Sequence, residues 1–90
     1  MIPKPYANWI DEHYPDYLSA RGKCREACLW MRQGFPELKV TNGFVSDGEA
    51  KQMHWWCLSP DGKIIDPTAR QFLDYVTYEE IDDSRHHRNS

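Results

Sequence analysis

The sequence predicts an α+β domain in which N-terminal helices pack on a small antiparallel β-sheet. One observation is a set of small and apolar residues at the spacing of a buried helix face, namely Cys24, Ala27, Cys28 and Met31. The other is a series of three short strand-like segments separated by two turn sequences, Ser46-Asp47-Gly48 and Ser59-Pro60-Asp61-Gly62. Helices followed by an antiparallel meander can bury one shared core between two layers.

The predicted helices occupy the first third of the chain. Pro3 and Pro5 mark an extended lead-in to a short helix over residues 6–14, which Pro15 ends. A helical turn follows over residues 16–20, and Gly22 interrupts the chain. The strongest helical pattern then runs over residues 24–33 and ends at Gly34, before Phe35-Pro36.

The predicted strands cover residues 38–45, 52–58 and 63–66, and residues 68–72 form a short helix. No strand is predicted over residues 75–81, where Glu79 and Glu80 read as part of a solvated acidic stretch. We expect one domain over residues 1–82 and a polar tail over residues 83–90, because 90 residues leave little room for a second core.

Composition excludes several classes of function. The net charge of −3 and the lack of a Lys/Arg cluster argue against a nucleic-acid partner. No apolar run approaches the roughly 20 residues of a membrane span. The N-terminus lacks the apolar region of a signal peptide, so we expect a cytoplasmic protein, in the host cytoplasm if a phage encodes it. In that compartment the three cysteines are free thiols.

The second turn decides whether His54 and Asp66 can meet. Proline at its second position and Gly62 at its fourth favour a type I turn followed by a glycine bulge. In that register Asp66 lies opposite Trp56 and diagonal to His54, within reach of a hydrogen bond. A two-residue turn would shift the register by one residue and send the two side chains to opposite faces.

Cys24 is the candidate nucleophile. A histidine oriented by a carboxylate is a general base, and a thiol at a helix N-terminus has a lowered pKa. The free N–H groups of the same helix end can stabilise an oxyanion. We expect the apolar face of this helix to cover the sheet face that carries His54, and so to bring Cys24 to the imidazole.

These residues resemble those of a known family. The segments Gly22-Lys23-Cys24-Arg25-Glu26-Ala27-Cys28, His54-Trp55-Trp56 and Asp66-Pro67-Thr68 are similar to the Cys, His and Asp motifs of transglutaminase-like enzymes of the papain-like superfamily. The resemblance covers residues 22–72 and is closest to small bacterial and phage proteins with an FPEL…HWW…DG.I.DPT..QF pattern. Most relatives are longer, and this chain is close to a minimal core.

The resemblance implies a papain-like fold and a catalytic triad of Cys24, His54 and Asp66 that needs no cofactor and no metal. It also implies attack on the amide carbonyl of a protein or peptide substrate, either a glutamine side chain or a peptide bond, through a thioacyl intermediate. Water or an amine could be the acceptor, so a deamidase, a peptidase and a transglutaminase all remain open. Supporting or substrate-binding roles fall to Trp55, Trp56 and Gln71, and we expect Trp56 to shield the His54–Asp66 pair from water.

Two alternatives carry different chemistry. A non-enzymatic module could keep the fold and present exposed aromatic residues to a partner protein. A structural zinc could instead be bound by Cys24, Cys28, His54 and Cys57, although Cys-x3-Cys is not the usual spacing and His54 and Cys57 diverge across a strand. Cys28 and Cys57 are otherwise expected in the core.

Overall fold

The computed structural model describes residues 2–72 and 75–81 and has the predicted α+β organisation. Its helices are α1 (Lys4–His13), α2 (Tyr17–Ala20) and α3 (Cys24–Gly34). They precede β1 (Lys39–Ser46), β2 (Lys51–Leu58), β3 (Ile64–Ile65), the short 3-10 helix η1 (Ala69–Gln71) and β4 (Thr77–Glu80). The four strands form an antiparallel sheet in the order β3-β2-β1-β4. The tail predicted for residues 83–90 lies outside the described residues.

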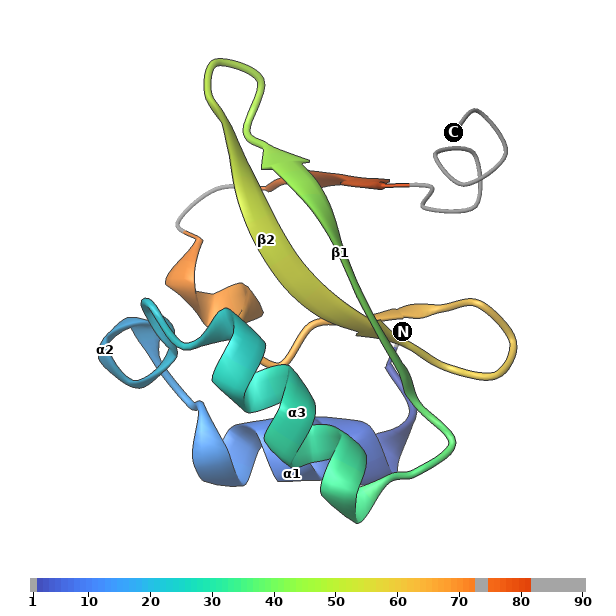
Figure 1. The fold of residues 1–90 in the computed structure, drawn as a ribbon. Coiled ribbons are helices and arrows are strands. Elements are labelled where there is room, and N and C mark those ends of the chain that lie inside the picture. Colours follow the sequence, from blue (N-terminus) through green and yellow to red (C-terminus); the bar gives the residue numbers. More distant parts are fainter. Residues whose placement is uncertain (1, 73–74, 82–90) are drawn as a thin grey trace.

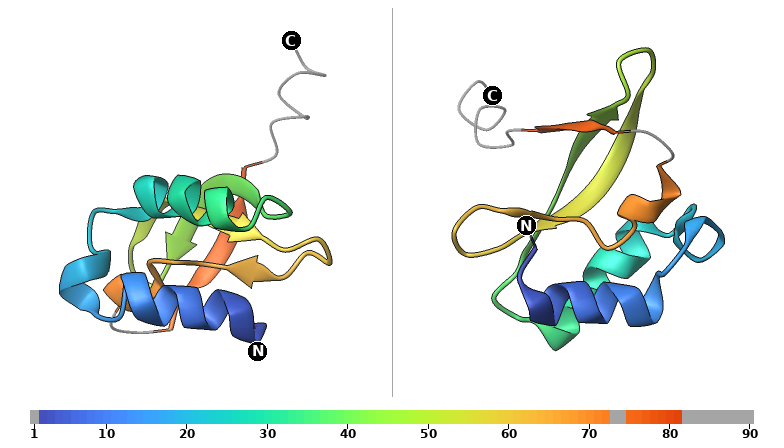
Figure 2. Two further views of the ribbon diagram at one scale, coloured as in Figure 1. Left: turned by 90° about the horizontal axis from the view of Figure 1, so that it is seen from below. Right: turned by 180° about the vertical axis from the view of Figure 1, so that it is seen from behind.

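The helices gather at one end of the long β1–β2 hairpin, and the other end of the hairpin projects away from them (Figures 1 and 2). Pro5 falls in the first turn of α1, where a missing N–H group removes no helical hydrogen bond. Asp16 caps α2 by accepting a hydrogen bond from the N–H of Ser19 at 2.9 Å. Gly22 takes a φ of 71° in the turn before α3, which strongly favours glycine.

The predicted register of the β2–β3 hairpin is confirmed. Cys57 pairs with Ile65 and Leu58 with Ile64, which places Asp66 on the side of the sheet that carries His54. The N–H of Ser59 donates to the carbonyl of Lys63 at 2.9 Å, and Gly62 has a φ of 86° at the bulge. Strand β3 is shorter than predicted, and the chain leaves the sheet at Asp66.

Strand β4 was not predicted. Its residues pair with the last four residues of β1, and Lys51 of β2 reaches Glu79 with an ion pair of 2.8 Å. Gly43 permits the close approach of the two strands, because a Cβ at this position would overlap the Glu79 carbonyl oxygen and lie 2.8 Å from the Glu80 Cα. Glu79 and Glu80 are therefore exposed strand residues.

The helix α3 packs on a different part of the sheet from the one predicted. Its buried residues Cys28 and Met31 share a core cluster with Cys57 and Ile65, which alternate with His54 and Asp66 along their strands. The helix therefore covers the face opposite His54, and the prediction that it covers the His54 face is wrong. The physical reason is that Cys57 and Ile65 give this face apolar partners for Cys28 and Met31, whereas the other face carries the buried polar pair His54 and Asp66.

Candidate active site

His54 and Asp66 form the buried centre of the candidate site. The Nε2 atom of His54 lies 2.9 Å from Oδ2 of Asp66, and the two side chains are only 2% and 3% exposed. The predicted hydrogen bond across the hairpin is thus present. Since Nε2 faces the carboxylate, the other ring nitrogen, Nδ1, is left for the Cys24 thiol.

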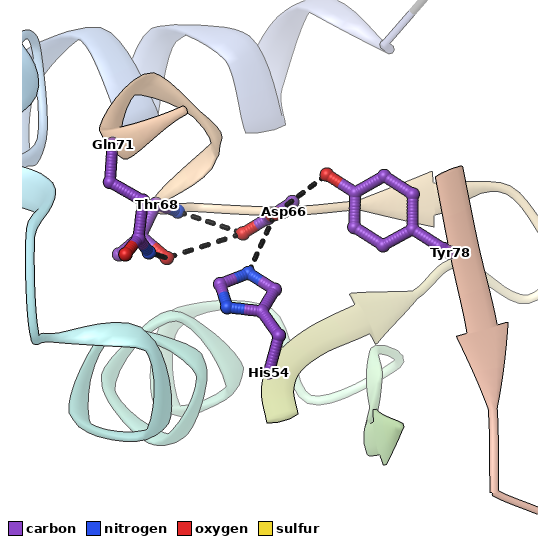
Figure 3. A network of polar contacts seen from close by, with 5 residues as sticks. All are labelled: His54, Asp66, Thr68, Gln71 and Tyr78. Atoms are coloured by element: carbon purple, nitrogen blue, oxygen red, sulfur yellow. Dashed lines mark hydrogen bonds and ion pairs between the residues drawn. The ribbon is translucent and has the colours of Figure 1, made fainter. Parts of the chain in front are cut away.

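Four donors surround the Asp66 carboxylate (Figure 3). Oδ2 accepts from His54 and, at 2.7 Å, from the hydroxyl of Tyr78. Oδ1 accepts from the backbone N–H of Thr68 at 3.0 Å and from its hydroxyl at 3.3 Å. A buried carboxylate with this many donors is held in one orientation.

Gln71 supports this network from η1. Its side-chain N–H donates to the hydroxyl oxygen of Thr68 at 3.0 Å, and Thr68 in turn donates to Asp66. Gln71 therefore acts on the carboxylate through Thr68. The sequence did not settle which group Gln71 would bind.

Cys24 approaches His54 around the outer edge of β2. It is the first residue of α3, is half-buried, and follows an N-cap residue, Lys23, that makes no side-chain cap. Backbone N–H groups of alternate strand residues point to the same edge. The N–H of Ser59 points toward β3, so the N–H of Trp55, four residues earlier, points to the same edge of β2. Strand β3 does not extend as far as Trp55, and the Cys24 sulfur lies near this N–H group instead.

The thiol and the imidazole shift each other's titration toward an ion pair. The pKa of Cys24 is lowered from its usual 9.0, chiefly by the hydrogen bond with the His54 side chain. Burial opposes this shift, and the N–H groups of Trp55 and Arg25 add to it. Burial alone would lower the pKa of His54, but Asp66 and Cys24 outweigh it and raise this pKa from 6.5 to about 9. The interaction of the two groups therefore favours the thiolate form of Cys24 and the protonated form of His54.

Aromatic rings enclose the imidazole. Trp56, which is fully buried, lies nearly parallel to it with ring centroids 6.2 Å apart, and Phe72 meets it edge-on at 4.9 Å. Tyr78 packs edge-on against Trp56 at 5.1 Å. Trp56 therefore lies where the sequence placed it, beside the His54–Asp66 pair. Trp55 points to the other face, where the Arg25 guanidinium lies 5.4 Å from its ring centre.

Sequence reasoning missed Tyr78, Phe72 and the role of Thr68. The Thr68 contact had a local signal, because an aspartate side chain commonly binds the backbone N–H two residues on. Tyr78 had none, since its position depends on the pairing of β4 with β1.

The two other cysteines lie in the core. The thiol of Cys57 is 3.9 Å from the Cys28 carbonyl oxygen, and both residues are fully buried. The pKa of Cys28 is raised, first by its interaction with Cys57 and then by burial. Across residues 2–72 and 75–81, no group of three or more His, Cys, Asp or Glu side chains is arranged to hold a metal ion.

No helix within residues 2–72 and 75–81 is long and apolar enough to cross a bilayer. In comparisons with known proteins, no family model, no curated protein and no solved structure matches the chain.

Proposed function

We propose that this chain is a transglutaminase-like cysteine enzyme with a papain-like core, acting on an amide carbonyl through a thioacyl intermediate. The observation that carries the proposal is the single imidazole of His54 shared between the Cys24 thiol and the Asp66 carboxylate, with the pKa of the thiol lowered and that of the imidazole raised. Thiol, base and orienting carboxylate are the parts that an activated nucleophile requires.

The reaction starts from the thiolate. The sulfur of Cys24 attacks the carbonyl carbon, a C–S bond forms, and the carbonyl oxygen becomes an oxyanion. The uncapped N–H groups at the start of α3 and the edge N–H of Trp55 lie near the sulfur and can donate to that oxygen. The His54 imidazolium gives its proton to the leaving amine as the C–N bond breaks, which leaves the thioacyl enzyme.

The second half of the reaction returns the enzyme to its starting state. His54 takes a proton from water or from an acceptor amine, the new nucleophile attacks the thioester, and Cys24 leaves as a thiolate. Asp66 holds the ring orientation and stabilises its positive charge in both halves. Tyr78 and Thr68 are positioning residues, because they act on the imidazole through Asp66.

The second candidate is a non-enzymatic module that binds a partner protein. The observation in its favour is a group of exposed large apolar side chains on α3 and β2: Leu29, Trp30 and Met53. Both functions use the same fold, so the thiol chemistry must separate them.

Labelling with 2-chloroacetamide, a small amide-containing electrophile, separates the two functions. The enzyme should be modified at Cys24 and not at the buried Cys28 and Cys57 at pH 7, as peptide mass mapping shows. Exposure alone would also favour Cys24, so the decisive comparison is His54→Ala. We expect it to slow labelling by at least about tenfold, since one unit of thiol pKa changes the thiolate fraction by that factor. An unchanged rate in folded His54→Ala protein would support the module.

A further inference from the structure

A groove of about 780 Å³ begins at the Cys24 thiol and lies between the exposed side of α3 and the first half of β2. Leu29, Trp30, Met53 and Trp55 give it an apolar lining. Three of these side chains, Leu29, Trp30 and Met53, are large apolar groups left exposed. A groove of this size and lining is suited to holding part of a substrate next to the nucleophile.

The strand edge beside the groove is open. Strand β3 pairs with β2 only at Cys57 and Leu58, and no other strand in the described ranges 2–72 and 75–81 pairs with that edge. By the alternation that directs the Trp55 N–H to this edge, the N–H and C=O of Met53 point to it as well. An open edge is a template for an extended peptide, whose backbone supplies matching donors and acceptors.

The groove also carries a fixed positive charge close to the thiol. The Arg25 guanidinium is held over Trp55, and among the described residues it forms no ion pair with a carboxylate. A guanidinium placed in this way is suited to a carboxylate of the substrate. Glu26 lines the same groove, so a basic substrate is the alternative to be tested.

From these three observations we propose that the acyl substrate is an extended polypeptide segment that pairs through its backbone with the outer edge of β2. It places a large apolar side chain in the groove and an acidic side chain beside Arg25. This inference rests on the proposed function, and it adds a mode of binding and a side-chain preference to it.

Short peptide nitriles test the inference. The Cys24 thiolate adds to the nitrile carbon and the nitrile nitrogen takes the proton of His54, which gives a reversible thioimidate. Each compound is an acetylated dipeptide joined to aminoacetonitrile. The residue next to aminoacetonitrile is Phe or Gly, and the residue before it is Glu, Gln or Lys. We expect the acetylated Glu-Phe compound to inhibit 2-chloroacetamide labelling of Cys24 most strongly, and the Phe-to-Gly change to weaken it about tenfold.

N-methylation tests the edge pairing, because only alternate amides of an extended peptide face β2. Methylating one of two consecutive amides should weaken inhibition about tenfold, and methylating its neighbour should change it by less than threefold. Equal effects at both positions would exclude pairing with the strand edge.

Protein variants assign the side-chain preferences. We expect Leu29→Ala and Met53→Ala to remove the advantage of Phe over Gly, and Arg25→Gln to remove that of Glu over Gln. Leu18→Ala is the matched control, because Leu18 is 74% exposed on α2 and should leave both preferences intact. A preference for Lys over Glu would overturn the charge assignment.

The outcomes separate this inference from the proposed function. If 2-chloroacetamide labels Cys24 in a His54-dependent way but the nitriles show no side-chain preference, the proposed mode of substrate binding is wrong. The proposal that the chain is a cysteine enzyme is then unaffected. If the labelling does not depend on His54, the proposed function is wrong as well.

Discussion

Replacing Asp66 by asparagine exchanges one carboxylate oxygen for an NH2 group at almost constant volume. All the neighbours of Asp66 in the structure are donors: His54 and Tyr78 on Oδ2, and the N–H and hydroxyl of Thr68 on Oδ1. In either orientation of the asparagine amide, its NH2 group therefore faces two hydrogen-bond donors and no acceptor. If the NH2 group faces His54, Nε2 must accept, and the imidazole becomes neutral.

The size of the effect follows from the pKa of His54. Its rise from 6.5 to about 9 corresponds to roughly 3 kcal/mol of stabilisation of the imidazolium. A group whose pKa is raised on folding contributes stability that is complete below pH 6.5 and is lost as the pH rises to about 9. We therefore expect Asp66→Asn to be destabilised most at pH 6, and the gap to wild type to narrow toward pH 9.

Cys24 reactivity gives the more specific measurement. Without the Asp66 charge, burial lowers the pKa of His54, the thiolate loses its cation, and the pKa of Cys24 rises. We expect labelling by 2-chloroacetamide at pH 6.5 to slow by about one to two orders of magnitude and its pH midpoint to move upward. Rates measured by mass spectrometry at pH 5.5–9.5 on folded protein, checked by near-UV circular dichroism, give the profile.

The matched control is Asp11→Asn, which makes the same atomic change in an exposed ion pair with Arg70. It should leave the rate and the midpoint unchanged. If folded Asp66→Asn protein also keeps the wild-type rate and midpoint, Asp66 does not act on the imidazole, and the reasoning from the four donors fails.

Three further predictions concern the surroundings of the site. Tyr78→Phe keeps the ring against Trp56 but removes the donor to Asp66, so urea denaturation should show a loss of about 1.5–3 kcal/mol, while a fall below 0.5 kcal/mol would contradict a strong hydrogen bond. Gly43→Ala should separate β4 from β1, so amide exchange over β4 should accelerate, and unchanged protection would count against the close packing at Gly43. Purified protein should carry no stoichiometric zinc by elemental analysis, and one zinc per chain would replace the triad by the site of Cys24, Cys28, His54 and Cys57.

The parts of the site that could be predicted from the sequence are those that local chemistry decides. The turn at Ser59-Pro60-Asp61-Gly62 fixes the register of β2 against β3, and that register alone puts His54 and Asp66 on one face. The α3 pattern likewise identifies Cys28 and Met31 as buried residues. These signals span a few neighbouring residues, so no knowledge of the whole fold is needed.

The remaining parts depend on contacts between distant segments. Strand β4 has no alternation of apolar and polar residues and forms because Gly43 lets it approach β1, so neither it nor Tyr78 could be predicted. Strand β2 has buried residues on both faces, so the α3 pattern shows which of its own residues are buried but not which face of the sheet they contact. The His54–Asp66 contact was therefore predicted correctly, while α3 was predicted on the wrong face of the sheet.

The assembly of the Asp66 network from separate segments also has a consequence for the newly made chain. Cys24 leaves the ribosome well before His54, and Tyr78 follows near the end of the described chain. Until the later strands have folded, the thiol has neither its imidazole nor the edge N–H of Trp55, and it behaves as an ordinary cysteine, mostly protonated at neutral pH. Under the proposed function, the thiol would therefore become an activated nucleophile only in the completed tertiary structure, and the rate of Cys24 labelling would report complete folding.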